Sequence, residues 1–121
     1  MPAELEVLRK QTKAFIEEYP LDIILQRNVA TPDGAGGTKL TPGPLPGGSQ
    51  TFRQITQGTS TGVFRRTLDG EEVAPDFVLL GEYDADVKSG DWYTKDGAKH
   101  EVVYVREDRR YESWAEVKYR G

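Results

Sequence analysis

The sequence FVLLGEYDADVKSGDWYTKDGAKHEVVYV, residues 77–105, decides the fold class of this chain. Apolar runs of strand length alternate in it with turn residues. They predict a strand from Phe77 to Tyr83, a turn in KSGD (88–91), a short strand in WYT (92–94) and a longer strand in HEVVYVRE (100–107). The dipeptide at positions 96–97, Asp-Gly, suits a hairpin turn, because glycine adopts positive φ at little cost. The segment therefore predicts consecutive antiparallel strands.

The longest of these strands alternates in character. Strict alternation places His100, Val102 and Tyr104 on one face of the sheet and Glu101, Val103 and Val105 on the other. After a turn in EDRR (107–110), the sequence YESWAEVKYR (111–120) supplies a last strand.

Upstream of this segment, the pattern indicates a helix and then more strands. Residues 2–19 read as an amphipathic helix that Pro20 ends, and we favour a helix covering the sheet over one that docks on a partner. Its expected apolar stripe is Leu5, Leu8, Thr12, Phe15 and Tyr19. Strands are expected at 21–29 and 50–57, followed by a break in GTSTG (58–62) and a strand in VFRRTL (63–68).

Six to seven short strands at intervals of about ten residues favour a small antiparallel β-barrel or sandwich over a βαβ sheet. The expected fold is therefore mainly β: one domain over residues 1–121, with an N-terminal α-helix, a long Gly/Pro-rich loop and the remaining barrel strands in 63–121.

The loop is an insert over residues 30–49 that separates two expected strands. It holds six glycines and four prolines, and Leu40 and Leu45 are its large apolar residues. It cannot bury enough apolar surface to fold alone, and Pro42, Pro44 and Pro46 stiffen it toward polyproline II. A structureless loop of this length is uncommon unless it is functional.

Composition excludes several classes of protein. The net charge of −4 argues against a surface that binds nucleic acid throughout, and the absence of cysteine excludes disulfides and a cysteine nucleophile. No apolar run is long enough to cross a membrane, and the N-terminus is charged, so we expect a protein made and kept in the cytoplasm.

Catalytic and metal-binding motifs are not apparent. The glycines of the insert lack the spacing of a phosphate-binding loop, and His100 is the single histidine, expected at a rim or on the surface. The acidic residues Glu82, Asp84, Asp86 and Asp91 lack the EF-hand pattern and indicate a solvated strand end. We therefore predict no enzyme, no catalytic residue, no cofactor and no metal.

Aromatic residues cluster near the C-terminus among Lys95, Lys99, Arg106, Arg109 and Arg110. The cluster comprises Trp92, Tyr93, Tyr104, Tyr111, Trp114 and Tyr119. It suits a platform that stacks single-stranded nucleic acid, but the acidic residues in the same stretch make us favour barrel core and protein contact.

Three stretches of the chain together resemble a known family. PLDIILQRNVATPDGAGG (20–37), PLPGGSQTFRQI (44–55) and residues 77–105 are similar to the head-to-tail stopper, or head-closure, proteins of tailed bacteriophages, particularly siphophages of actinobacteria. The resemblance covers most of the chain from Leu21 onward. Known stoppers are small β-barrels that form a ring beneath the portal and adaptor, project loops into the channel and present the surface on which the tail docks.

The resemblance implies a structural protein of the virion neck, synthesised in the host cytoplasm. Its implied partners are further copies in a ring (six-fold, with twelve-fold as the alternative), the adaptor and portal, the tail terminator or tail tube, and packaged double-stranded DNA without sequence specificity, but no membrane. The alternatives are a tail terminator or adaptor of the same neck and a small barrel that binds single-stranded nucleic acid.

By the resemblance, the insert is the projecting loop. Its candidates for channel or inter-subunit contact are Thr31, Pro32, Asp33, Gly34, Gly36, Gly37, Lys39, Leu40, Pro42, Pro44, Leu45 and Pro46. The candidate interface residues are Arg27, Phe52, Arg53, Trp92, Arg109, Arg110, Tyr111 and Trp114.

Overall fold

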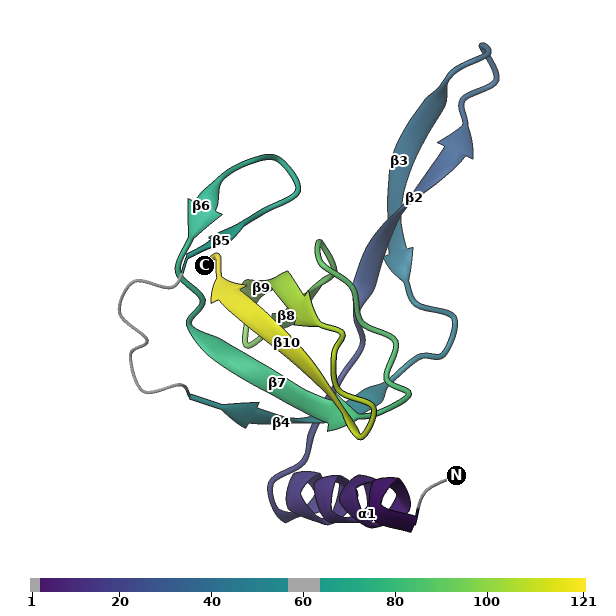
Figure 1. The fold of residues 1–121 in the computed structure, drawn as a ribbon. Coiled ribbons are helices and arrows are strands. Elements are labelled where there is room, and N and C mark those ends of the chain that lie inside the picture. Colours follow the sequence, from purple (N-terminus) through teal and green to yellow (C-terminus); the bar gives the residue numbers. More distant parts are fainter. Residues whose placement is uncertain (1–2, 57–63) are drawn as a thin grey trace.

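The strands predicted between residues 77 and 120 form the centre of one curled antiparallel sheet (Figure 1). The computed structural model describes residues 3–56 and 64–121. Its elements are α1 (Ala3–Glu18), β1 (Leu21–Ile23), β2 (Gln26–Pro32), β3 (Thr38–Pro44), β4 (Gln50–Ile55), β5 (Arg65–Arg66), β6 (Glu72–Val73), β7 (Phe77–Glu82), β8 (Trp92–Lys95), β9 (Ala98–Arg106) and β10 (Glu112–Tyr119). The predicted fold class, a mainly β chain with a barrel-like sheet and an N-terminal helix, is confirmed. The predicted number of six to seven strands is too low, because the described residues form ten, and the single strand predicted at 21–29 is divided between β1 and β2.

The sheet has the strand order β1-β4-β7-β10-β9-β8-β2-β3, while β5 and β6 form a separate hairpin. β1 and β2 are consecutive in the chain but lie on opposite sides of the sheet, β1 beside β4 and β2 beside β8. Ile24 and Leu25 alone separate them, so this segment bridges the two sides and curls the sheet into an incomplete barrel. Within the described residues, the pairing of β2 with β8 is limited to Gln26 and Trp92.

The core lies inside the curl and receives side chains from both halves of the sheet. Its buried members are Ile23, Leu25, Leu45, Phe52, Phe77, Leu79, Val87, Tyr93, Val102, Ala115 and Val117. Gly81 of β7 pairs with Phe52 on one side and Ser113 on the other. A Cβ atom at this position would lie 2.8 Å from the Phe52 ring and 2.5 Å from Ser113 Oγ. Glycine is required there because its cross-strand neighbours occupy the space.

The strict alternation predicted for residues 100–105 is wrong, because a β-bulge interrupts the pairing of β9 with β10. The pairing passes from Val102 to Tyr104 while β10 advances by one residue, which makes Val103 the extra residue. Val102 and Val105 therefore both pack on the core, although strict alternation puts them on opposite faces.

Helix α1 contacts β7 and β4, on the side shown below the sheet in Figure 1. The predicted apolar stripe is partly wrong: Thr12 and Ile16 are the buried residues, whereas Phe15 and Tyr19 are exposed. Arg53 of β4 explains the difference, because its guanidinium lies 3.7 Å from the centre of the Phe15 ring and bonds the Phe15 carbonyl at 2.9 Å. The helix still covers the sheet, as expected.

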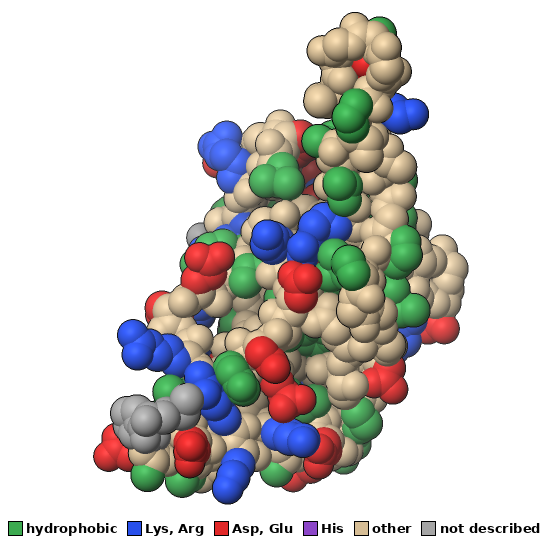
Figure 2. All heavy atoms as spheres, turned by 90° about the vertical axis from the view of Figure 1, so that its right-hand side faces the viewer, with side chains coloured by type: hydrophobic (Ala, Val, Ile, Leu, Met, Phe, Trp, Pro, Cys, Tyr) green, Lys and Arg blue, Asp and Glu red, His purple; other side chains and the backbone are tan. Residues whose placement is uncertain are grey.

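The insert predicted as an extended loop over residues 30–49 is instead largely a β-hairpin. β2 and β3 pair continuously from Gln26–Pro44 to Pro32–Thr38, and this hairpin, residues 26–44, is here called the arm. The arm stands clear of the barrel in Figures 1 and 2. The predicted polyproline II stiffening is wrong for Pro42 and Pro44, which lie in β3. β3 tolerates both prolines because it is an edge strand.

The strand predicted in VFRRTL (63–68) is reduced to β5, which pairs with β6, a strand that sequence reasoning missed. The turn between them is held by side chains: the Thr67 hydroxyl bonds the Asp69 carboxylate and accepts the N–H of Glu71 at 3.1 Å. The predicted break in GTSTG (58–62) lies outside the described residues, as do Val63 and the last residue of the strand predicted at 50–57.

Candidate functional site

The tip of the arm is shaped by Asp33. Its Oδ1 atom accepts the N–H groups of Ala35 at 2.8 Å and Gly37 at 3.1 Å, and its own N–H donates to the Gly37 carbonyl at 3.2 Å. Gly34 and Gly36 have φ of 83° and 86°, a region that favours glycine. The Gly-rich sequence of the insert therefore serves to turn the chain between β2 and β3.

The shaft, by which we mean the paired strands of the arm between Arg27 and the tip, exposes apolar side chains of a kind that is usually covered. Val29 is 54% exposed and Leu40 is 68% exposed, and the Thr31 and Thr41 hydroxyls bond each other across the strands at 3.2 Å. Figure 2 shows hydrophobic side chains along this projecting surface. An isolated two-stranded hairpin is marginally stable in water, so contact with another molecule would stabilise the shaft.

The base of the arm is anchored by an ion pair. Arg27 of β2 donates from Nε and Nη2 to the two carboxylate oxygens of Asp91, each at 2.8 Å, and from Nη2 to Asp86 at 2.9 Å. Asp91 is 1% exposed and also accepts the N–H of Lys88 at 2.8 Å. The hydrogen bonds to Asp91 raise the pKa of Arg27 further above its ordinary value. A bidentate pair of this kind fixes the relative orientation of the two side chains in addition to providing a favourable charge interaction.

Apolar contacts complete the anchor. Leu25 and Leu45, which flank the arm in the chain, both belong to the core, and the Leu45 N–H donates to the Leu25 carbonyl at 3.0 Å. Gln50 holds the loop that carries Asp86, because its side-chain amide exchanges two hydrogen bonds with the Asp86 backbone, at 2.7 and 2.8 Å. The arm is therefore fixed at its base and free along its shaft.

The acidic run predicted as a solvated strand end has a different role. Asp91 is buried and Asp86 pairs with Arg27, so both carboxylates position the arm. Sequence reasoning missed this because Arg27 lies more than fifty residues away from both of them. The signal available in the sequence was one arginine in an otherwise uncharged strand.

Of the insert candidates, Leu45 is buried in the core and Pro46 lies in the following turn; the others belong to the arm. Leu45 therefore cannot make a channel contact. Thr31 is half-buried, and the remaining candidates in the arm, Pro32, Asp33, Gly34, Gly36, Gly37, Lys39, Leu40, Pro42 and Pro44, are exposed.

The predicted interface residues do not form one surface. Phe52 is fully buried in the core, so its assignment to an interface is wrong. Arg53 is engaged with the C-terminal end of α1, where its Nη1 also bonds Glu18 at 3.0 Å. Tyr111 lines a crevice beside α1, whereas Trp92 lies next to the base of the arm.

Three further interface candidates, Arg109, Arg110 and Trp114, lie where β9 joins β10. Arg109 bonds Glu112 at 2.6 Å, and its guanidinium is 5.1 Å from the centre of the Trp114 ring. Arg110 is exposed, and its carbonyl accepts a hydrogen bond from Arg9 of α1 at 3.1 Å. The hydrogen bond from Arg9 links the β9–β10 connection to the helix.

The aromatic cluster is likewise divided. Tyr93 is buried in the core, where burial raises the pKa of its hydroxyl, and the guanidinium of Arg65 lies 3.8 Å from the Tyr104 ring. His100 is half-buried: it stacks on Tyr93 with ring centres 4.9 Å apart and meets Tyr119 edge-on at 5.5 Å. A stacking row that includes the Tyr93 ring is therefore ruled out.

The His100 site shows no constellation for acid–base chemistry in the described part of the chain. The Nδ1 atom is buried without a hydrogen-bond partner there, and burial lowers the pKa of the imidazole. Across residues 3–56 and 64–121, no three His, Asp or Glu side chains come together in a way that could hold a metal ion. The one helix that the structure describes is too short and too polar to cross a bilayer.

Comparison with known protein families, with curated proteins and with solved structures found no match to this chain.

Proposed function

We propose that this protein is a head-to-tail stopper of a tailed bacteriophage. In this role it is a ring subunit between the portal and adaptor on one side and the tail on the other, and it closes the DNA channel. The observation that carries the proposal is the arm, a hairpin held firmly by Arg27 and Asp91 at its base and exposed along its shaft.

The energetics of the arm support a role in assembly. The exposed side chains of Val29 and Leu40 gain from burial, at roughly 25 cal/mol per Å² of apolar surface, only when another molecule covers them. In a closed ring, each copy of the arm meets a neighbouring copy or the contents of the channel. The rigid base directs the shaft, so a neighbour meets it in a defined orientation.

The charge of the arm suits contact with DNA that must still move. Between residues 28 and 44 it carries one acidic residue, Asp33, and one basic residue, Lys39. A nearly neutral arm on a chain of net charge −4 gains little from binding phosphate, and binding without sequence preference depends on such gains. The arm can therefore block a channel without binding the DNA tightly.

The test is a shortened arm in the phage that encodes this chain. Replacing residues 30–40 by Asn-Gly keeps Arg27, Leu25 and Leu45, so the barrel is expected to fold. Particles that carry this variant should lose packaged DNA or fail to join tails, as measured by electron microscopy and plaque counts. The control is Ala35→Ser, an exposed change at the tip of the full-length arm.

Two results would overturn the proposal. One is normal infectivity of the shortened-arm phage. The other is a reconstruction of the neck in which the ring between adaptor and tail is built by a different protein. The same reconstruction separates a stopper from a tail terminator, because a terminator ring lies at the end of the tail tube.

A further inference from the structure

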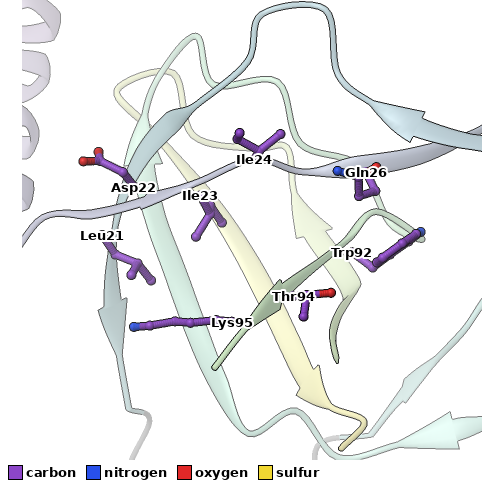
Figure 3. Close-up of a pocket in the computed structure, with 8 residues that line it drawn as sticks. All are labelled: Leu21, Asp22, Ile23, Ile24, Gln26, Trp92, Thr94 and Lys95. Carbon is purple, nitrogen blue, oxygen red and sulfur yellow. The ribbon is translucent and has the colours of Figure 1, made fainter. Parts of the chain in front are cut away.

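The barrel has an open groove where its sheet does not close. The groove lies between β1 and β8, has a volume of about 560 Å³ and is drawn in Figure 3. Its lining residues come from 21–26 and 92–95. β1 pairs with β4 on its other side, and β8 pairs with β9 and meets β2 at Trp92. Among the residues that the structure describes, each of the two strands therefore turns toward the groove an edge that is unpaired apart from Trp92.

Backbone groups of Thr94 point into this groove. The turn after β8 has positive φ at Asp96 (53°) and Gly97 (78°), the pattern of a type I′ hairpin, in which the flanking pair Lys95–Ala98 is hydrogen-bonded. Hydrogen-bonded and non-hydrogen-bonded pairs alternate along an antiparallel ladder, so the N–H and C=O of Thr94 face away from β9. In the described chain neither group bonds another backbone group.

The side chains along the groove are suited to an extended chain. In Figure 3, Leu21 and Ile23 point from β1 toward β8 and form an apolar floor. Ile24 at the rim is 47% exposed. The three residues of β1, at about 3.3 Å each, span roughly 10 Å, and the pairing of Gln26 with Trp92 closes the groove at its far end, so the groove accommodates about three paired residues of a strand.

We propose that the groove binds an extended peptide segment of a partner protein by β-strand addition. The segment pairs its backbone with Thr94 on one side and with β1 on the other, and directs uncharged, β-branched side chains at alternate positions onto Leu21 and Ile23. A peptide backbone is the partner that supplies donors and acceptors to both edges together. The inference does not depend on the proposed phage function.

A second copy of this chain is a poorer occupant. The strand edge that projects from a second copy is β3, in which Pro42 and Pro44 lack the N–H groups that a ladder needs. The prolines therefore protect the arm from strand addition, whereas β1 and β8 carry no proline.

The test uses the full chain and a defined probe, the capped peptide acetyl-Thr-Val-Thr-Val-Thr-amide. Titration followed by amide NMR should move the Thr94 and Ile23 signals, with the Thr94 amide moving downfield as its N–H becomes bonded. The same peptide with N-methyl groups at alternate amides is the matched ligand control and should cause no such shifts. Shifts confined to the arm, or none up to about 5 mM peptide, would refute the groove.

Two variants sharpen the result. Thr94→Pro removes the N–H that faces the groove while leaving the bonds of β8 to β9, and it should weaken binding about tenfold or more. Ile24→Glu puts a charge at the rim and should weaken binding similarly, with Val29→Glu, a change on the arm at a residue of similar exposure, as its control. Unchanged affinity in Ile24→Glu contradicts the proposal even where Thr94→Pro fails to fold.

Discussion

Individual residues decide how the arm is attached. Arg27 and Asp91 form a bidentate pair in which the carboxylate is almost fully buried, and Asp86 adds a second, exposed partner for the same guanidinium. Removing one member of a buried pair costs more than the pair contributes, because the remaining charge stays desolvated. The anchor is thus a residue-level feature on which stability depends.

We expect Arg27→Met to lower the free energy of unfolding by about 2–4 kcal/mol, because it leaves the Asp91 carboxylate buried without its guanidinium. Urea denaturation followed by circular dichroism measures the change. The control is Arg66→Met, whose partner Glu72 is exposed like Arg66 itself, with an expected loss below about 1 kcal/mol. Equal losses in the two variants would contradict the role of the anchor.

Gly81 offers a second test at this scale. We expect Gly81→Ala to destabilise the protein by about 1–3 kcal/mol, since the added methyl group would overlap the Phe52 ring and Ser113 Oγ. Gly43→Ala, in β3, has no atom within 4 Å of the new methyl group and should be nearly neutral. Thermal unfolding of both variants distinguishes overpacking from a general cost of replacing strand glycines.

His100 should make stability depend on pH. Burial and Lys95 lower the pKa of the folded imidazole, opposed by Asp96 and Asp76, so the unfolded chain binds the proton first as pH falls. The contribution of the neutral His100 to stability is therefore complete above about pH 6.5 and is lost as the pH drops below that value. The measurement compares unfolding free energies at pH 7.5 and 5.5 with those of His100→Phe. A decrease of equal size in the variant would exclude His100 as the cause.

At the scale of elements, strands behave differently according to what covers them. β7 and β10 lie inside the sheet with strands on both sides, whereas β2 and β3 leave the barrel and pair with each other along the arm. Local opening is easiest where few buried contacts hold the backbone. The arm should therefore open without unfolding the barrel.

We expect amide hydrogen exchange to divide the chain accordingly. The shaft amides of Val29 and Thr41, which the alternation of the ladder places in a hydrogen-bonded pair, should exchange at least about a hundredfold faster than those of Leu79 and Ala115, which are buried in the core. Leu45, whose N–H bonds Leu25, should behave like the core although it directly follows the arm. Equal protection of shaft and core in the isolated subunit would show that the arm needs no partner for its stability.

At the scale of the whole molecule, the central feature is that the stability of the barrel does not depend on the shaft of the arm. The core draws on residues before and after the arm, yet no residue between positions 26 and 44 belongs to it. The part of the arm beyond Arg27 can thus vary without loss of the fold. This separation suits the proposed function, in which the arm serves assembly and the barrel carries it.

The shortened arm, with Asn-Gly in place of residues 30–40, tests this separation in the isolated protein. We expect its midpoint of thermal unfolding to stay within about 4 °C of the full chain, because no core contact is lost. A much larger decrease would mean that the shaft stabilises the barrel, and it would remove the basis for treating the two as independent.

The sequence by itself determined the elements whose signals are local. The strands in residues 77–120, the helix up to Glu18 and the turn at Asp96 and Gly97 follow from periodicity and from turn chemistry, and the barrel-like class follows from their spacing. Neighbouring residues carry these signals, so no long-range contact is needed to predict them.

Only the tertiary structure decided the rest. The bulge at Val103, the burial of Ile16 instead of Phe15, and the pairing of Arg27 with Asp91 each depend on residues that are distant in sequence. The insert pairs as a hairpin despite its prolines because β2 gives β3 a partner on one side and solvent lies on the other. Composition describes what a segment can bury, whereas its partners decide which structure it adopts.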